Sequence, residues 1–294
     1  MKTLINIIKS CRPLLWLKTF WVMLLAAYLV FNNMPPIKEL LFGFLILGPL
    51  MWSGLYIIND LSDLKVDIHH NEKKKRPIIS GILNKKLALT FAILLISTSL
   101  ILSTLINIYF FLAILLTLVN QLTYTLKPFR FKESANYDFI SCGILGQMLR
   151  FLAGWFLFTT SFNIPILGII LATLSKTAGF LFYRLHHYDL EKKLKYKSSV
   201  MTYNKTTIKV SAFTLMFTAI ISFFLMLLND KFFNIEGIGK LPFNLIYLTP
   251  IVLFIAPFYL KILKNPNLYT NRFIRHVSYV ILTLSLILAL PILI

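Results

Sequence analysis

Acidic side chains are scarce in this chain of 294 residues, which has 11 Asp and Glu but 30 Lys and Arg. Charged residues of both signs reach only 14%, against about 25% in soluble globular domains. Cysteine is nearly absent, and Cys11 and Cys142 have neither the spacing of a metal site nor the number needed for a disulfide framework. These shortages argue against a soluble globular domain, a zinc module and a disulfide-stabilised secreted protein.

Hydrophobic sequence is abundant instead: 57% of the residues are apolar, and the mean hydropathy is +0.76. Apolar segments of roughly 17 to 25 residues follow one another, long enough to cross about 30 Å of hydrocarbon as helices. The short alternating strands that a membrane barrel needs are not visible. The sequence therefore predicts an all-α, polytopic membrane protein that forms one domain over residues 1–294.

Nine transmembrane helices are expected. They cover Leu14–Phe31, Leu40–Ile58, Leu87–Ile106, Tyr109–Leu126, Phe139–Thr159, Ile164–Tyr183, Val210–Leu228, Phe243–Leu260 and Val277–Leu293. The third and fourth are separated only by Asn107 and Ile108, which predicts a very tight turn. No small-residue cleavage site follows the first apolar run, so we expect that helix to be retained.

Basic residues concentrate in the N-terminal arm and in the loops after the second, fourth, sixth and eighth spans. By the positive-inside rule, the N-terminus is then cytoplasmic and the C-terminus lies outside. The large polar loops after the second and sixth spans therefore face the cytoplasm from the cell membrane. This topology, together with anionic ligands, accounts for the net charge of +19, and no nucleic acid partner is expected.

The segment from Asn59 to Gly81 is the main polar feature. Asn59, Asp63 and Asp67 recur every four residues, so on a helix they share one face. Their oxygens suit a hard divalent cation, and Mg2+ is usually held by one or two carboxylates together with substrate phosphates. The alternative is a merely solvated helix end, but Asp60, Asp63 and Asp67 place three of the eleven acids within eight residues. We therefore predict a Mg2+ site at Asn59, Asp63 and Asp67.

Basic residues follow the acidic segment, because residues 73–76 are three lysines and an arginine, donors suited to phosphate. The loop after the sixth span repeats this order, with Asp189 followed by four lysines within residues 192–197. Two such loops on one side of the membrane can enclose a diphosphate between them. The candidate catalytic carboxylates are Asp60, Asp63, Asp67 and Asp189.

Three cations, Lys18, Arg150 and Lys176, fall within predicted spans. An unpaired cation in hydrocarbon costs at least about 2.5 to 3.5 kcal/mol on insertion scales, so such residues usually face a cavity or a partner. We expect this of Arg150, which lies mid-span. Lys18 lies near the cytoplasmic surface, and Lys176, about two turns from it, has the alternative of extending to the lipid headgroups.

Residues 59–67 follow the pattern N-D-x-x-D-x-x-x-D, and Arg76-Pro77 is followed by Ser80-Gly81 in the pattern R-P-x-x-S-G. In these motifs the chain resembles the UbiA superfamily of intramembrane prenyltransferases. The nine-helix layout and the cytoplasmic polar loops agree with that family, so the resemblance covers nearly the whole chain. It implies a Mg2+-dependent membrane transferase that acts on a polyprenyl phosphate or diphosphate.

Further segments are similar to the decaprenyl-phosphate phosphoribosyltransferase branch of that superfamily. They are residues 12–20 (R-P-x-x-W-x-K), His70 with Lys73 and Arg76, Tyr124 with Lys127, Leu149 with Arg150 and Gly154, and Asp189 with Leu190, Val200, Met201 and Tyr203. The resemblance implies substrate-binding roles. These would fall to Lys18, His70, Lys73, Arg76, Tyr124, Lys127, Arg150, Arg184 and Tyr203.

Two departures from the family patterns are informative. Aromatic prenyltransferases of the superfamily carry a second D-x-x-x-D motif, but here Lys193 stands four residues after Asp189. The Lys-Arg pair of the phosphoribosyl branch is also incomplete, because Arg184 is displaced and His186 and His187 take its place. Adjacent histidines lack the i, i+4 spacing of a helical zinc site, so phosphate contacts or interfacial placement are expected for them.

Three functions remain open on the sequence. The leading hypothesis is transfer of phosphoribose from 5-phosphoribosyl diphosphate to polyprenyl phosphate, with metal and basic side chains stabilising the leaving diphosphate. The alternative keeps the metal site but moves a polyprenyl group from its diphosphate to an aromatic acceptor. The third is a lipid-phosphate transporter, although Pro35, Pro36, Pro165 and Pro242 lie near span ends and not at the mid-membrane breaks that transporters use.

Overall fold

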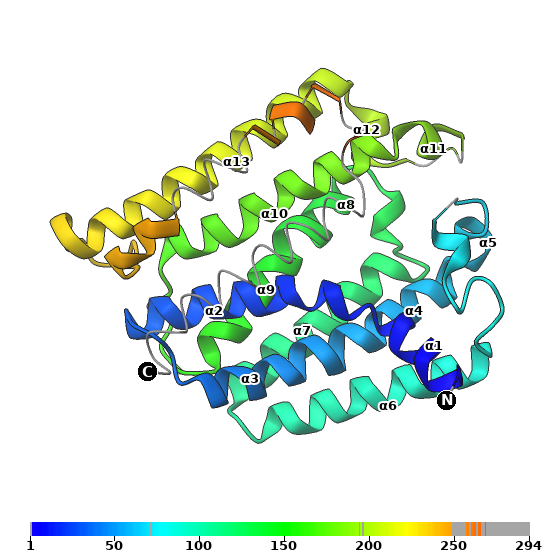
Figure 1. Ribbon diagram of the computed structural model, residues 1–294, viewed down its shortest axis with the longest axis horizontal. Helices are drawn as coiled ribbons and strands as arrows, with labels where there is room; N and C mark the ends of the chain where they lie inside the picture. The colour runs from blue at the N-terminus through cyan, green and yellow to red at the C-terminus, as the bar shows by residue number, and fades with distance from the viewer. Residues whose placement is uncertain are drawn as a thin grey trace.

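The computed structural model of the protein describes residues 2–70, 72–193, 195, 197–248, 257–258, 260–262, 264–265 and 268. Within these ranges the regular structure is helical, apart from one isolated bridge between Ser134 and Lys197. Figure 1 shows the long helices running alongside one another as a bundle. The prediction of an all-α fold is therefore confirmed for the described part of the chain.

Among the described residues, six helical segments are long and apolar enough to span a membrane, and the bent pair Thr3–Leu15 and Leu17–Phe31 makes seven if it counts as one span. The six are Ile37–Ser62, Lys85–Thr104, Ile108–Thr125, Tyr137–Phe156, Ile166–His186 and Lys205–Phe233. Each overlaps one of the second to seventh predicted spans. The eighth predicted span begins with a short 3-10 helix, Phe243–Leu248 (η7), and then lies largely outside the described residues, as the ninth does entirely. The count of nine stays a prediction.

The first predicted span is preceded by a helix that the sequence did not indicate. These elements are α1 (Lys2–Cys11), a 3-10 turn (Pro13–Leu15, η1) and α2 (Leu17–Phe31). The chain breaks between α1 and α2 because Arg12 takes a left-handed conformation (φ 52°) and Pro13 has no backbone N–H to donate. The two helical parts meet at 43°. This break places Arg12 beside Asp60, where it forms an ion pair.

The tight turn predicted between the third and fourth spans is confirmed. Only three residues separate α6 (Lys85–Thr104) from α7 (Ile108–Thr125). Asn107 makes this possible because its side-chain oxygen accepts the N–H of Phe110 (2.9 Å) and so caps α7. Its amide group also donates to the carbonyl of Phe156 (2.7 Å), which ties the turn to the end of α9.

Three of the described spans contain a π-helical segment: one is η6 (Asn229–Phe233), at the end of the span Lys205–Phe233, and the other two lie in spans that carry residues of the predicted site. These two are η2 (Ile46–Trp52), between α3 (Ile37–Leu45) and α4 (Ser53–Ser62), and η5 (Ile140–Leu145), between α8 (Tyr137–Phe139) and α9 (Gly146–Phe156). Pro49 lies inside η2 and removes one backbone donor from the regular helical ladder. Such widened turns are frequent at functional sites.

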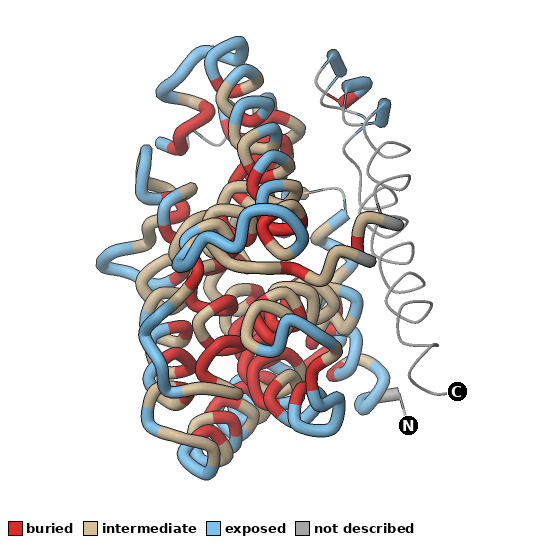
Figure 2. The backbone as a smooth tube through the Cα atoms, turned by 90° about the vertical axis from the view of Figure 1, so that its left-hand side faces the viewer, coloured by how far each residue is buried: buried red, intermediate tan, exposed pale blue. Residues whose placement is uncertain are grey.

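Close packing of the helices buries the centre of the bundle, as Figure 2 shows by its buried positions. Figure 1 places α10 (Ile166–His186) beside α13 (Lys205–Leu228). The helices α2 and α9 approach through Gly154, where an added Cβ would lie only 2.6 Å from the Cα of Met23. Large apolar side chains on the outside of α6, including Leu94 and Ile101, are more than half exposed, as expected for a surface that faces lipid.

One end of the bundle gathers the polar loops, and we call it the polar end. It comprises the N-terminal arm (residues 2–16) and the loops 63–84, 126–136 and 187–204, which contain α5 (Leu64–Asp67), α11 (Tyr188–Lys193) and α12 (Ser199–Thr202). Ion pairs join these loops across large sequence separations, such as Lys132 Nζ to Asp63 Oδ1 at 2.6 Å. The loops after the second and sixth spans therefore share one end, as the sequence predicts, while its cytoplasmic orientation stays a prediction.

A buried ionic network fixes the loop 187–204 to the rest of the polar end. Arg184, at the end of α10, pairs with Glu191 (2.6 Å) and lies 3.6 Å from Asp138. It also donates to the backbone carbonyl of Lys132 at 2.8 Å. The hydroxyl of Ser198 donates to the second oxygen of Glu191. Because Lys132 in turn binds Asp63 through its amino group, the network connects α11 to the acidic segment of α4.

Replacing Gly154 by Ala should destabilise the bundle. The new methyl group would meet the backbone of Met23, which moves only if α2 moves, so overpacking should cost about 1 to 3 kcal/mol. We expect a lower melting temperature for purified protein in detergent. The matched control is Gly43→Ala, whose methyl group meets only the rotatable side chain of Leu157. Equal melting temperatures for both variants would contradict this account of the α2–α9 contact.

Replacing Glu191 by Gln should also lower the melting temperature. The substitution leaves the buried Arg184 without its closest counter-ion, and breaking a buried ion pair on one side costs about 3 kcal/mol or more. Asp189→Asn is the control, because Asp189 lies two residues away but is exposed. A stability loss for Asp189→Asn as large as that for Glu191→Gln would show that the network does not carry the effect.

Candidate active site

The acidic segment lies where α4 ends and α5 begins. The two helices meet at Asp63, whose backbone (φ −101°, ψ 7°) leaves the helical region. The acidic residues therefore do not lie on one continuous helix, contrary to the prediction. Helical hydrogen bonding resumes directly after Asp63, because the N–H of Asp67 donates to the carbonyl of Asp63 at 2.8 Å. Asp60, Asp63 and Asp67 are all buried, with 0%, 6% and 1% of their surface exposed. We call these three carboxylates together with Asn59 the acidic face.

Asp60 is held between two arginines. Its Oδ1 pairs with Arg12 from the N-terminal arm and with Arg76 from the loop 63–84, the latter at 2.8 Å. Its Oδ2 is buried and has no hydrogen-bond partner among the described residues. Arg76 also reaches Asp67 at 3.5 Å, and Lys73 pairs with Asp67 at 2.9 Å. The basic residues predicted to follow the acidic face therefore contact it directly.

Asp63 is paired by a third segment that the sequence did not single out. Lys132 Nζ lies 2.6 Å and Arg130 Nη2 lies 3.0 Å from its Oδ1. Burial lowers the pKa of Lys132, while the neighbouring Asp63 opposes that shift. Arg130 also pairs with Glu133 at 2.5 Å. The only signal in the sequence is that this loop is basic and follows the fourth span, which puts it on the same side of the membrane as the acidic face.

The acidic face has the oxygen donors that Mg2+ prefers. Asn59 is half-buried beside the three carboxylates. Oδ2 of Asp60 is a buried oxygen with no hydrogen-bond donor among the described residues. In the described ranges, no three His, Cys, Asp or Glu side chains form a ready-made metal cage. Ammonium and guanidinium groups instead neutralise the carboxylates. Oxygen ligands with few carboxylates suit Mg2+, which usually keeps substrate phosphates among its ligands.

A second group of cations lies deeper in the bundle. Arg150 on α9 is 2% exposed and stacks on the ring of Trp52, with its Cζ 3.6 Å from the ring centre. It also donates to the hydroxyl of Thr19 (3.1 Å) and to the carbonyl of Gly146 (2.7 Å). Trp52 precedes Asp60 by eight residues, which corresponds to roughly 12 Å along a helix. Arg150 therefore lies about two turns further into the bundle than the acidic face.

Lys18 on α2 and Lys176 on α10 surround the same region. The charges of Lys18, Arg150 and Lys176 interact with one another, and Lys18 Nζ lies 5.7 Å from the ring centre of Tyr56. None of these three cations forms an ion pair with a carboxylate in the part of the chain that the structure describes. Lys18, Arg150 and Lys176 form one group of basic side chains inside the bundle. We call these three residues the interior cations.

The remaining predicted substrate-binding residues are distributed over the polar end. His70 contacts His187 across the two large loops, with ring centres 5.1 Å apart. Tyr124 on α7 interacts electrostatically with Arg184, which serves the buried network described above. The hydroxyl of Tyr203 donates to Asn136 at 2.7 Å and so joins two loops.

Lys127 and Asp189 are exposed. Their assignment to the site stays a prediction. The buried acid of the second large loop is Glu191, which forms an ion pair with Arg184. The sequence did not distinguish Glu191 from Asp189.

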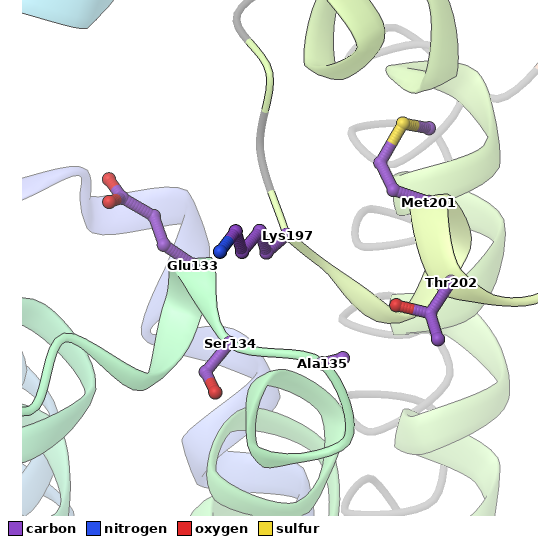
Figure 3. Close-up of a pocket in the computed structure, with 6 residues that line it drawn as sticks. All are labelled: Glu133, Ser134, Ala135, Lys197, Met201 and Thr202. Atoms are coloured by element: carbon purple, nitrogen blue, oxygen red, sulfur yellow. The ribbon is translucent and has the colours of Figure 1, made fainter.

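A separate cavity of about 440 Å3 opens between the loops 126–136 and 187–204 (Figure 3). It is lined by Glu133, Ser134, Ala135, Lys197, Met201 and Thr202. In Figure 3 the side chain of Lys197 extends toward Glu133. One acid and one base give this cavity little net charge, and none of its lining residues belongs to the acidic face or to the interior cations. The charged groups suited to a diphosphate therefore lie elsewhere.

Comparison with known proteins gives two kinds of curated relative. The chain is 31% identical over 102 residues to decaprenyl-phosphate phosphoribosyltransferase of Mycobacterium tuberculosis, which covers 32% of this chain and 33% of that protein. It is 38% identical over 84 residues to 4-hydroxybenzoate octaprenyltransferase of Shewanella frigidimarina, which covers 29% of each. The matches thus span about a third of the curated relatives' length.

Solved structures share the fold over almost the whole chain. A UbiA homologue from Archaeoglobus fulgidus, bound to GPP and Mg2+, superposes with a TM-score of 0.74 at 21% identity and covers 95% of this chain and 96% of its own. A structure described as digeranylgeranylglyceryl phosphate synthase in membranes gives a TM-score of 0.66 at 20% identity, covering 98% and 97%. The family model for UbiA prenyltransferases matches residues 15–279. The resemblance seen in the sequence is confirmed, and the chain belongs to the UbiA prenyltransferase family.

Proposed function

We propose that this intramembrane prenyltransferase transfers phosphoribose from 5-phosphoribosyl diphosphate to a polyprenyl phosphate, with release of diphosphate. The observation that carries the proposal is the presence of two cationic regions at different depths. One surrounds the acidic face at the polar end, and the other is formed by Lys18, Arg150 and Lys176 inside the bundle. Two phosphorylated substrates, one soluble and one lipid, require two such regions.

The acidic face would receive the soluble substrate. Asn59, Asp63 and Asp67 would hold Mg2+, which supplies charge neutralisation for the departing diphosphate. Lys73, Arg76 and Lys132 now neutralise the same carboxylates at 2.6 to 3.5 Å. When the carboxylates bind a metal ion, these side chains become available to donate to the phosphate oxygens, with charge-assisted hydrogen bonds of the stronger kind.

The interior cations would bind the phosphate of the lipid. In the transfer, an oxygen of the lipid phosphate forms a bond to C1 of the ribose, and the bond from C1 to the diphosphate oxygen breaks. Because a phosphate monoester carries negative charge near neutral pH, no strong general base is needed. The contribution of this chain is then positioning and electrostatic stabilisation, which are large terms in transfer reactions of this kind.

A second candidate function is transfer of a polyprenyl group from its diphosphate to an aromatic acceptor. It is favoured by the octaprenyltransferase relatives, which match segments of similar length and identity. It is disfavoured by the second large loop, where Glu191 is tied to Arg184 and Ser198, and Lys193 stands in place of a second paired carboxylate. The interior cations would then bind the charged group of the acceptor.

Turnover by purified protein in detergent with Mg2+ separates the two candidates. One reaction contains radiolabelled 5-phosphoribosyl diphosphate and polyprenyl phosphate, and the other contains polyprenyl diphosphate and labelled 4-hydroxybenzoate. We expect label in the organic phase only in the first, no turnover after chelation of Mg2+, and at least about a hundredfold loss for Asp67→Ala. Prenylated aromatic product in the second reaction alone would contradict the proposal.

Substitutions in the two cationic regions should affect different substrates. Arg76→Ala removes a donor at the acidic face and should raise KM for 5-phosphoribosyl diphosphate by about tenfold to a hundredfold, since hydrogen bonds to charged groups contribute about 1.5 to 3 kcal/mol. Lys176→Met keeps the apolar stem but removes an interior charge, and should raise KM for polyprenyl phosphate instead. The reverse pattern, or equal effects on both substrates, would contradict the assignment of the two regions.

A further inference from the structure

Three histidines and a tyrosine meet where the loops 63–84 and 187–204 contact each other. The rings of His70 and His187 are 5.1 Å apart and tilted by 33°. His187 also packs on Tyr183 (4.3 Å) and, edge to face, on His186 (4.7 Å). We call these four residues the imidazole cluster. It joins a loop after the second span to a loop after the sixth.

Hydrogen bonds determine which ring nitrogens carry protons. Nδ1 of His70 accepts the backbone N–H groups of Glu72 (3.3 Å) and Lys73 (3.4 Å), so the proton of this ring is on Nε2. Nδ1 of His187 donates to the carbonyl of Tyr183 at 2.9 Å, so its Nε2 is an acceptor. The cluster therefore presents one N–H donor from one loop and one lone pair from the other.

Two of these nitrogens lack a partner. Nε2 of His70 and Nδ1 of His186 are buried and make no hydrogen bond within the described residues. A buried polar group without a partner is costly, by about 1 to 3 kcal/mol. Such groups usually bind water, an ion or a ligand. The imidazole cluster thus has hydrogen-bonding capacity that the loops themselves do not use.

The hydrogen bonds require a neutral His70 ring, because an Nδ1 that accepts two backbone N–H groups carries no proton. Burial lowers the pKa of His187 to about 3, so this ring is neutral near pH 7 as well. A phosphate group would be bound better by the lysines and arginines of the acidic face than by neutral rings. A prenyl chain would leave the unpartnered nitrogens buried against hydrocarbon. Neutral groups that both donate and accept hydrogen bonds, such as hydroxyls, satisfy the cluster best.

The cluster borders the acidic face through Lys73. This lysine pairs with Asp67 at 2.9 Å, and its charge interacts with His70, His187 and Tyr183. A substrate whose diphosphate lies at the acidic face would place its next chemical group beside the rings. The phosphates and the adjoining group would then be recognised by different kinds of side chain.

We infer that the imidazole cluster binds the hydroxyl groups of a sugar diphosphate, with His70 donating and His187 accepting. The inference rests on the proposed function, because it takes the diphosphate at the acidic face to belong to the soluble substrate. It assigns the sugar part of that substrate to a place between the two large loops and gives a role to His187, which the family motifs do not explain. Residues of both large loops would then contact one substrate.

Calorimetric titration of purified protein with Mg2+ tests this inference. The ligands are 5-phosphoribosyl diphosphate, inorganic diphosphate and geranyl diphosphate, and the variants are His70→Phe and His187→Phe. Phenylalanine keeps a ring for packing but removes the nitrogens. We expect each variant to bind 5-phosphoribosyl diphosphate about three- to tenfold more weakly, as for loss of a neutral hydrogen bond, and inorganic diphosphate within about twofold of the wild type. His69→Phe, at an exposed neighbouring position, is the control and should match the wild type.

Each other outcome overturns the inference in a recognisable way. An equal loss for both ligands in His70→Phe and His187→Phe would show a role in phosphate binding or in loop structure. Unchanged affinity for 5-phosphoribosyl diphosphate in both variants would show that the cluster only packs, while leaving the proposed function in place. Tighter binding of geranyl diphosphate than of 5-phosphoribosyl diphosphate by the wild type would remove the proposed function together with the inference.

Discussion

Neutralisation of three buried carboxylates is the constraint on which the polar end depends. Asp60, Asp63 and Asp67 lie almost wholly out of solvent, where an unpaired charge is costly. Their counter-ions come from three separate segments: the N-terminal arm, the loop 63–84 and the loop 126–136. A fourth segment is added through the carbonyl of Lys132, which accepts from Arg184. Charge pairing therefore sets how these loops lie relative to one another.

The same pairing is relevant to function. The bases that neutralise the carboxylates are the groups a diphosphate would need, so the site has donors and acceptors in place for a metal ion and an anion together. The interior cations are different, because none of them pairs with a carboxylate in the described structure, and Lys18 and Arg150 lie against aromatic rings. Arg150 also donates to neutral oxygens. The described bundle thus combines a neutralised polar end with an interior that holds three basic side chains.

Much of the acidic face could be predicted from local spacing, because residues four apart on a helix are neighbours wherever that helix lies. Its partners could be predicted only in part. Lys73 and Arg76 follow in the same loop, but Arg12, Arg130 and Lys132 reach the face from other parts of the chain. Asp189 is the predicted acid of the second large loop, but the structure exposes it and buries Glu191. The sequence could not separate the two, because both lie in one short segment and the helical phase of α11 decides which is buried.

The sequence by itself determined the membrane character, the approximate positions of the second to seventh spans, the acidic residues of the face and the family, because hydrophobic length and motif spacing are local properties of the chain. Only the tertiary structure decided which base neutralises which carboxylate, that Arg184 and Glu191 hold a loop, and that His70 meets His187. These contacts join loops on different spans. They depend on how the helices pack against one another, and that information is not contained in the pattern of any single segment.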